Sequence, residues 1–205
     1  FFKQKTAYEI QFGDWSSDVC SSDLTPDEEQ LVVDAYLRVR ATLPDTCLVL
    51  APRHLERVGE VERLLQARGL SPHRRSQLPL QGSAHAQVVI VDTFGELASL
   101  YSVADVVVVG GAFAPLGGQN LFQPLAHGKP VFFGPYTHNF RDIAQLAKAA
   151  GVGFEVQTAE QLADGILRLL HDPKLREQIA QQASELIQRH QGAAQRCAEA
   201  VKKWL

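Results

Sequence analysis

The sequence predicts an α/β protein, in which a Rossmann-like parallel sheet is covered by helices on both faces. From Thr25 onward, short apolar runs alternate with longer amphipathic segments, and only short loops separate them. This alternation is typical of parallel sheets whose strands are joined by helices. The apolar runs are continuous rather than alternating in polarity, which indicates strands that are buried on both faces. Residues 25–205 are therefore expected to form one domain.

The first helix is expected to begin directly after Thr25 and to reach about Ala41. Thr25 is a residue type that caps helices, and Pro26 suits the first helical position, where its missing N–H is not needed. Glu28 stands three residues after Thr25, which completes the pattern of a capping box.

The remaining elements follow from the same alternation. Apolar runs predict strands over residues 47–51, 88–91, 105–109 and 130–133, and an edge strand over 153–156. Helical spacing predicts helices over residues 56–68, 119–127, 140–149, 159–170 and 172–204, and one that ends near residue 103. Glycine or proline stands at several boundaries, such as Pro52 and Gly69.

Residues 1–24, FFKQKTAYEIQFGDWSSDVCSSDL, differ in character from the rest of the chain. They show neither helical nor strand periodicity, and they resemble translated sequencing-adapter read-through rather than a natural segment. A natural disordered N-terminus is the alternative. In both cases we expect the segment to be disordered and to carry no function.

Composition excludes several classes of function. A formal net charge of −3 offers no basic surface for a nucleic acid, and the short basic pair Arg74-Arg75 does not change this. The three cysteines, an odd number without CxxC spacing, indicate neither a disulfide framework nor a metal site. No apolar run approaches the roughly 20 residues that span a bilayer. The motifs of P-loop enzymes, zinc proteases and dinucleotide-binding enzymes are absent.

Ligands of open parallel sheets bind beyond the carboxyl ends of the strands, and three polar or glycine-rich segments follow predicted strands. These segments are Pro52-Arg53-His54, Phe94-Gly95-Glu96 and residues 117–123. Gly117-Gly118-Gln119-Asn120 is expected to open a helix whose N–H groups and dipole bind a phosphate. Gln123, in the same first turn, would reach a ribose hydroxyl. The structural alternative is a glycine-relieved helix start with Asn120 as its cap.

The other candidate residues also have structural alternatives. Arg53 can bind a phosphate or carboxylate through two parallel hydrogen bonds, or be an ordinary surface arginine. His54 can act as a general acid or base, although capping of the next helix is favoured. Glu96 suits the first turn of its helix without any ligand, because the helix dipole favours a carboxylate there. His138 and Asn139 are expected to cap the following helix rather than to line the cleft.

Three segments in order resemble the C-terminal domain of the bacterial Kdo (3-deoxy-D-manno-octulosonic acid) transferases, which are two-domain glycosyltransferases of the GT-B type. LVLAPRHLERVGEVERLL is similar to the family's PRHPER segment, and VDTFGELASLYSVADVVVVGGAF to its DTMGEL and ADVAFVGGS region. GGQNLFQPLAHGKPVFFGPYTHNFRDI is similar to its GGHNPLEPAA and GP.T.NF stretch. The resemblance extends from about Thr25 to the C-terminus. It implies that the first strand of the domain, expected just before Thr25, is missing and replaced by the foreign segment.

The resemblance implies that the loops bind CMP-Kdo. The implied site consists of Pro52, Arg53, Phe94, Gly95, Glu96, Gly117, Gly118, Asn120, Leu121, Phe122 and Gln123. Two positions depart from the family, because Gln119 replaces its histidine and Gln123 replaces its glutamate. A glutamine keeps a carbonyl acceptor but loses the charge, which weakens a hydrogen bond to a ribose by about 1 kcal/mol.

The resemblance also implies a role for the parent enzyme in lipopolysaccharide biosynthesis. It would transfer Kdo from CMP-Kdo to a lipid A precursor at the cytoplasmic side of the inner membrane, without a cofactor or metal. The family's catalytic glutamate, acceptor surface and membrane anchor belong to the other domain, so this chain is expected to be soluble and inactive alone. The alternatives are half of a UDP-sugar transferase or epimerase, and a non-catalytic nucleotide-binding fragment.

Overall fold

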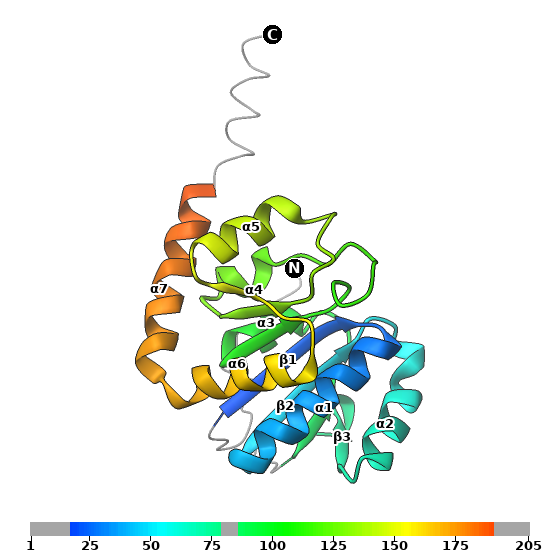
Figure 1. The fold of residues 1–205 in the computed structure, drawn as a ribbon. Coiled ribbons are helices and arrows are strands. Elements are labelled where there is room, and N and C mark those ends of the chain that lie inside the picture. Colours follow the sequence, from blue (N-terminus) through cyan, green and yellow to red (C-terminus); the bar gives the residue numbers. More distant parts are fainter. Residues whose placement is uncertain (1–16, 79–85, 191–205) are drawn as a thin grey trace, which may run out of the picture.

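The structure, a computed structural model, describes residues 17–78 and 86–190 (Figure 1). Seven parallel strands form one sheet in the order β3-β4-β2-β1-β5-β6-β7, which confirms the predicted fold class. The strands are β1 (Ser17–Leu24), β2 (Thr46–Pro52), β3 (Pro72–Arg74), β4 (Val88–Ile90), β5 (Val106–Val109), β6 (Val131–Phe133) and β7 (Gly153–Glu155). The helices are α1 (Pro26–Thr42), α2 (Val58–Ala67), α3 (Leu97–Val103), α4 (Phe122–Ala126), α5 (Arg141–Ala149), α6 (Ala159–His171) and α7 (Pro173–His190), with short 3-10 helices η2 (Leu55–Arg57) and η3 (Arg75–Gln77).

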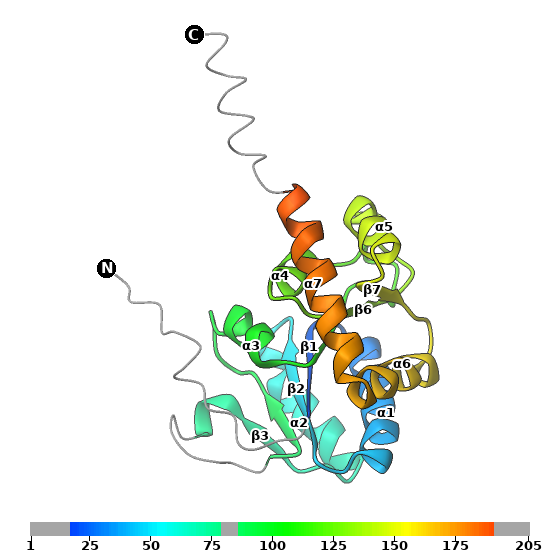
Figure 2. The same ribbon diagram turned by 90° about the vertical axis from the view of Figure 1, so that its left-hand side faces the viewer.

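The strand order distributes the helices over both faces of the sheet. α1 and α2 follow steps from β1 toward β3, whereas α3, α4 and α5 follow steps in the opposite direction, from β4 toward β7. Because crossovers between parallel strands are right-handed, these two groups cover opposite faces. Figure 2 shows α1 and α3 on opposite sides of the sheet. α6 packs against α1, and α7 packs against α4 and α5.

Burial explains the apolar strand sequences. β2 is buried along its whole length, and the four valines of β5 are each at most 1% exposed. The capping box predicted for α1 is present, since the Thr25 N–H donates to Glu28 Oε2 at 2.9 Å. The β2 and β5 strands and the α1 start are therefore confirmed close to their predicted bounds.

The expectation that residues 1–24 are disordered and that the first strand is missing is wrong for Ser17–Leu24. These residues form β1 at the centre of the sheet, hydrogen-bonded to β2 on one side and to β5 on the other. The strand escaped the sequence pattern because buried serines interrupt its apolar residues: Ser21 Oγ donates to Val49 O at 3.3 Å, and Ser22 Oγ lies 2.8 Å from the Tyr101 hydroxyl. Residues 1–16 lie outside the described part, and the foreign origin of the segment stays a prediction.

β3 and η3 were not predicted, because Pro72–Arg74 contains no apolar run and is only partly buried. The Arg74-Arg75 pair is not a basic surface patch, since Arg74 Nη2 donates to Glu62 Oε2 at 2.7 Å and Arg75 is only 7% exposed.

The last helix is described as far as His190, and its predicted continuation to residue 204 lies outside the described residues. Within the described ranges, no helix is both long and apolar enough to cross a membrane.

Candidate functional site at the carboxyl edge of the sheet

The order of the strands reverses next to β1. From β1 the chain moves to β2 on one side, while β5 on the other side is reached only after β4. Open α/β sheets bind ligands beyond the carboxyl ends of the strands at such a reversal. The loops after β2, β4 and β5, which carry the predicted site residues, all leave from this edge.

The loop after β2 presents Arg53 without a structural partner. Pro52 is buried at the end of β2, and Arg53 is exposed. Among the described residues, the Arg53 guanidinium forms no hydrogen bond or ion pair. A guanidinium that makes no contact within the described fold is available to bind an anionic ligand.

Arg57, four residues later, contrasts with Arg53. Its guanidinium donates to both carboxylate oxygens of Glu29, at 2.8 and 3.0 Å, and to Glu60 Oε2 at 3.1 Å. Burial lowers the pKa of Arg57, but the hydrogen bonds and charges of Glu29 and Glu60 outweigh it and raise this pKa above its ordinary value. Arg57 therefore joins α1 to α2 and is not available to a ligand.

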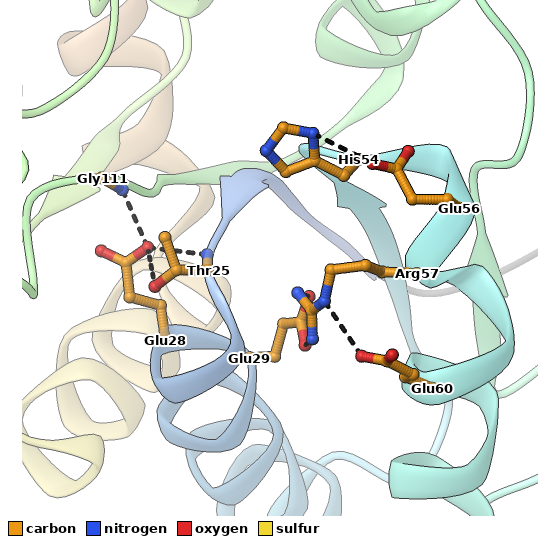
Figure 3. A network of polar contacts seen from close by, with 8 residues as sticks. All are labelled: Thr25, Glu28, Glu29, His54, Glu56, Arg57, Glu60 and Gly111. Atoms are coloured by element: carbon orange, nitrogen blue, oxygen red, sulfur yellow. Dashed lines mark hydrogen bonds and ion pairs between the residues drawn. The ribbon is translucent and has the colours of Figure 1, made fainter.

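The expectation that His54 caps the following helix is wrong. His54 occupies the N-cap position of η2, but its side chain makes no capping hydrogen bond. The ring instead lies 3.6 Å from Glu56, measured from Nδ1 to Oε1, and is exposed (Figure 3). The imidazole is next to the carboxylate of Glu56 and makes no hydrogen bond to an N–H group of η2.

The loop after β4 displays an aromatic ring. Phe94 is 88% exposed, and Gly95 beside it has φ +84°, a conformation that favours glycine. The base of the loop is fixed by Asp92, whose carboxylate accepts hydrogen bonds from Ser76 N at 2.8 Å and Ser76 Oγ at 2.5 Å. Burial raises the pKa of Asp92, but the hydrogen bonds from Ser76, together with the Asp92 backbone N–H and the charge of Arg74, outweigh this effect and lower the pKa.

Glu96 is the N-cap residue of α3 and lies before its first turn, which corrects the predicted position. Its Oε2 lies 3.0 Å from Nε of the buried Arg75 and accepts a hydrogen bond from Thr93 Oγ1 at 3.0 Å. The contact with Arg75 is an ion pair without the alignment of a hydrogen bond, since Nε has no hydrogen-bond partner. Sequence reasoning missed Arg75 as the partner of Glu96. The two residues come together because they follow β3 and β4, which are neighbours in the sheet.

The glycine-rich segment after β5 differs from the predicted helix start. α4 begins at Phe122 and has only five residues, so Gly117 and Gly118 belong to a loop with φ +98° and +82°. The Gly118 N–H already donates to Gly111 O at 2.7 Å and is not available to a phosphate. The alternative role of Asn120 as the cap is also wrong in detail, because Leu121 is the N-cap residue of α4. Asn120 Oδ1 nevertheless accepts a hydrogen bond from Phe122 N, at the first position of the helix, at 2.9 Å.

The residues after Gly118 present backbone donors that the fold does not use. In the described part of the chain, the backbone N–H groups of Gln119 and Asn120 have no hydrogen-bond acceptor, and Gln123 is exposed in the first turn of α4. Unsatisfied amides in a glycine-rich loop can bind an anion without a long helix behind them. The predicted helix dipole contributes little here, because α4 is so short.

His138 and Asn139 do not cap α5, contrary to the expectation. The N-cap residue is Phe140, without a side-chain capping bond. Asn139 Nδ2 instead donates to Leu116 O at 3.2 Å, and the Asn139 N–H donates to Gly117 O at 3.0 Å. A Cβ on Gly117 would lie 2.1 Å from Asn139 Nδ2 and 2.8 Å from His138 Nε2. The loop after β6 thus braces the glycine loop.

A buried carboxylate joins the start of α1 to the glycine loop, and sequence reasoning gave it only the local role of a capping box. Glu28 is 1% exposed, and its Oε2 accepts hydrogen bonds from Gly111 N and Thr25 N, both at 2.9 Å. Its Oε1 accepts from Phe113 N at 2.9 Å. Figure 3 shows Glu28 directed toward Gly111 and the neighbouring Glu29 directed toward Arg57.

Comparison with known proteins gives consistent matches. Residues 74–186 match the family described as Glycosyl transferases group 1. The 3-deoxy-D-manno-octulosonic acid transferase of Bordetella pertussis is 41% identical over 166 residues, which is 81% of this chain and 39% of that protein. The enzyme of the same name from Haemophilus influenzae is 32% identical over 179 residues, which is 87% of this chain and 42% of that protein.

A solved structure agrees with these relatives. The crystal structure of the C-terminal CMP-Kdo binding domain of WaaA from Acinetobacter baumannii matches with a TM-score of 0.77 and 31% identity. The match covers 84% of this chain and 89% of that domain. The chain therefore corresponds to about one domain, and it spans 39% and 42% of the length of the two curated relatives.

Proposed function

Because this chain belongs to the group 1 glycosyl transferases, and within them to the Kdo transferases as a C-terminal domain, we propose that it binds CMP-Kdo as the donor for Kdo transfer. One observation carries the proposal. The chain is similar to a solved domain described as CMP-Kdo binding, and the match covers 89% of that domain. Arg53 and the backbone amides after Gly118 have no partner in the part of the chain that the structure describes, so they suit an anionic ligand and support the proposal.

The proposed contacts divide among the three loops. Arg53 and the amides of Gln119 and Asn120 bind the phosphate of CMP and stabilise the charge that develops on it when Kdo departs. Gln123 accepts a ribose hydroxyl from the first turn of α4. The remaining lining residues of the proposed site are Pro52, Phe94, Gly95, Glu96, Gly117, Gly118, Leu121 and Phe122.

The two family departures affect binding strength rather than the position of the site. Gln119 and Gln123 are neutral where the family has a histidine and a glutamate, so the charge of the ribose acceptor is lost. We therefore propose a weaker nucleotide complex than a glutamate at position 123 would give.

The parent protein is proposed to transfer Kdo to a lipid A precursor, at the cytoplasmic side of the inner membrane. The base that activates the acceptor, the acceptor surface and any membrane contact are assigned in this proposal to the part of the relatives that the chain does not span. Membrane association and lipid recognition would therefore come from that part, and the chain alone transfers no Kdo.

Calorimetric titration of the 205-residue chain tests the proposal. CMP should bind with a measurable heat, and UDP and UMP should bind more weakly by at least tenfold. Tighter binding of UDP than of CMP would favour a UDP-sugar transferase or epimerase instead. A folded chain that binds none of these nucleotides would contradict the donor site, and Kdo transfer by the chain alone would contradict the division of roles between domains.

A further inference from the structure

We infer that Glu28 is a positioning residue of the donor site, which holds the loop after β5 in the shape that presents residues 117–123 to the nucleotide. This inference rests on the proposed function, because CMP is the ligand whose binding it affects. Glu28 itself is only 1% exposed and its oxygens are occupied by the protein, so it acts through the loop and not by touching the ligand.

The contacts of Glu28 exceed what a capping box requires. A capping glutamate needs to reach only the N–H of the N-cap residue, here Thr25, and it normally remains at the surface. Glu28 also accepts hydrogen bonds from the Thr25 hydroxyl at 3.0 Å and from the N–H groups of Gly111 and Phe113, both at 2.9 Å. Two of its four donors therefore belong to a loop more than 80 residues away in the sequence.

These two hydrogen bonds continue into the part of the loop that carries the predicted ligand contacts. Gly111 has φ +74°, and its carbonyl accepts the Gly118 N–H at 2.7 Å. Gly118 directly precedes Gln119 and Asn120, whose amides have no acceptor within the described residues. The Glu28 carboxylate thus holds the N–H of Gly111, and the carbonyl of Gly111 holds the N–H of Gly118. Gly118 is the residue directly before the two amides that have no acceptor within the described residues.

The chemistry of the site favours a carboxylate over an amide. All four partners of Glu28 are donors, and an ionised carboxylate is an acceptor at both oxygens. In Glu28→Gln, one of the two ends becomes an NH2 group that faces an N–H of Gly111 or Phe113, so at least one buried backbone donor loses its acceptor. The loop would then relax away from α1.

Glu29 is a matched control for this substitution. It is the next residue of the same helical turn, it is also 1% exposed, and its carboxylate also accepts charged or polar donors. Its partner is Arg57 on η2, and within the described residues it forms no hydrogen bond or ion pair with the loop after β5 (Figure 3). Glu29→Gln therefore removes an equally buried charge and leaves the Gly111 contact in place.

The experiment compares the wild-type chain, Glu28→Gln and Glu29→Gln by calorimetric titration with CMP, by urea unfolding and by amide hydrogen exchange. Both variants should lose stability, but Glu28→Gln should weaken CMP binding about tenfold more than Glu29→Gln does. Exchange at Gly111, Phe113 and Gly118 should accelerate about tenfold or more in Glu28→Gln and should stay at the wild-type rate in Glu29→Gln.

Equal effects of the two substitutions on CMP affinity and on loop exchange would overturn the inference. If the wild-type chain binds no CMP, the proposed function fails, and the exchange rates alone decide whether Glu28 positions the loop. If Glu28→Gln does not fold, the wild-type chain still provides a test: Gly111 and Phe113 amides that exchange as fast as unprotected loop amides would refute the role of Glu28.

Discussion

Arg53→Ala should weaken CMP binding by about 1.5 to 3 kcal/mol, the range for a hydrogen bond to a charged group. This corresponds to a dissociation constant raised about 10- to 150-fold. The guanidinium is exposed and has no partner among the described residues, so its removal leaves no buried group unpaired. The free energy of unfolding should therefore change by no more than about 0.5 kcal/mol.

Isothermal titration with CMP measures the affinity, and urea unfolding followed by circular dichroism measures the stability. Arg63→Ala is the control, because Arg63 is an exposed arginine that, among the described residues, bonds only to Gly59 O of its own helix, through Nε at 3.1 Å. Both substitutions remove one positive charge, so a general electrostatic effect would weaken binding equally. An Arg53→Ala chain that is folded and binds CMP as tightly as the wild type would refute the assignment of Arg53 to the phosphate.

Three further predictions concern the loops. Gln123→Glu should leave CMP affinity equal or higher in the same titration, because a carboxylate accepts ribose hydroxyls more strongly than an amide; weaker binding would contradict it. Gly117→Ala should cost about 1 to 3 kcal/mol in urea unfolding and weaken CMP binding, since the new Cβ would meet Asn139 Nδ2 at 2.1 Å with φ at +98°; unchanged stability would count against this. Asp92 has a lowered pKa in the folded chain, so its stabilisation is present above about pH 4 and is lost as pH falls through that pKa. Ser76→Ala should therefore move the acid-unfolding midpoint, followed by circular dichroism, to higher pH, and an unmoved midpoint would show that this hydrogen bond is unimportant.

Most of the fold could be predicted from local patterns. The apolar runs of β2 and β5 and the capping box at Thr25 are each complete within a few residues, so the sequence alone reveals them. β1 could not be found in this way, because it contains two buried polar residues, Ser21 and Ser22. Their hydroxyl groups are satisfied by Val49 and Tyr101, which lie far away in the sequence. A periodicity analysis does not detect a central strand whose polar side chains form hydrogen bonds with residues distant in the sequence.

The edge of the sheet at which the candidate residues lie was predicted more accurately than their local contacts. Arg53 and Phe94 stand at the carboxyl ends of strands, which the strand pattern places at one edge. The roles of His138 and Asn139 depended on which loop lies opposite them, and the structure puts the glycine loop there. The start of α4 at Phe122 also depends on tertiary contacts, because Gly118 bonds to Gly111 and not within a helix.

The sequence by itself determined the fold class, the order of most strands along the chain and the segments that follow them, because these depend on local propensity and on apolar patterning. Only the tertiary structure decided which charged side chains belong to the fold and which remain available. Arg57 and Arg75 are held by Glu29 and Glu96, whereas Arg53 has no partner in the described part of the chain. The physical reason is that a charged side chain contributes to the fold when folding buries it beside a partner. Such partners can be far apart in the sequence, as Glu28 and Gly111 are, 83 residues apart, so no local sequence pattern indicates the pair.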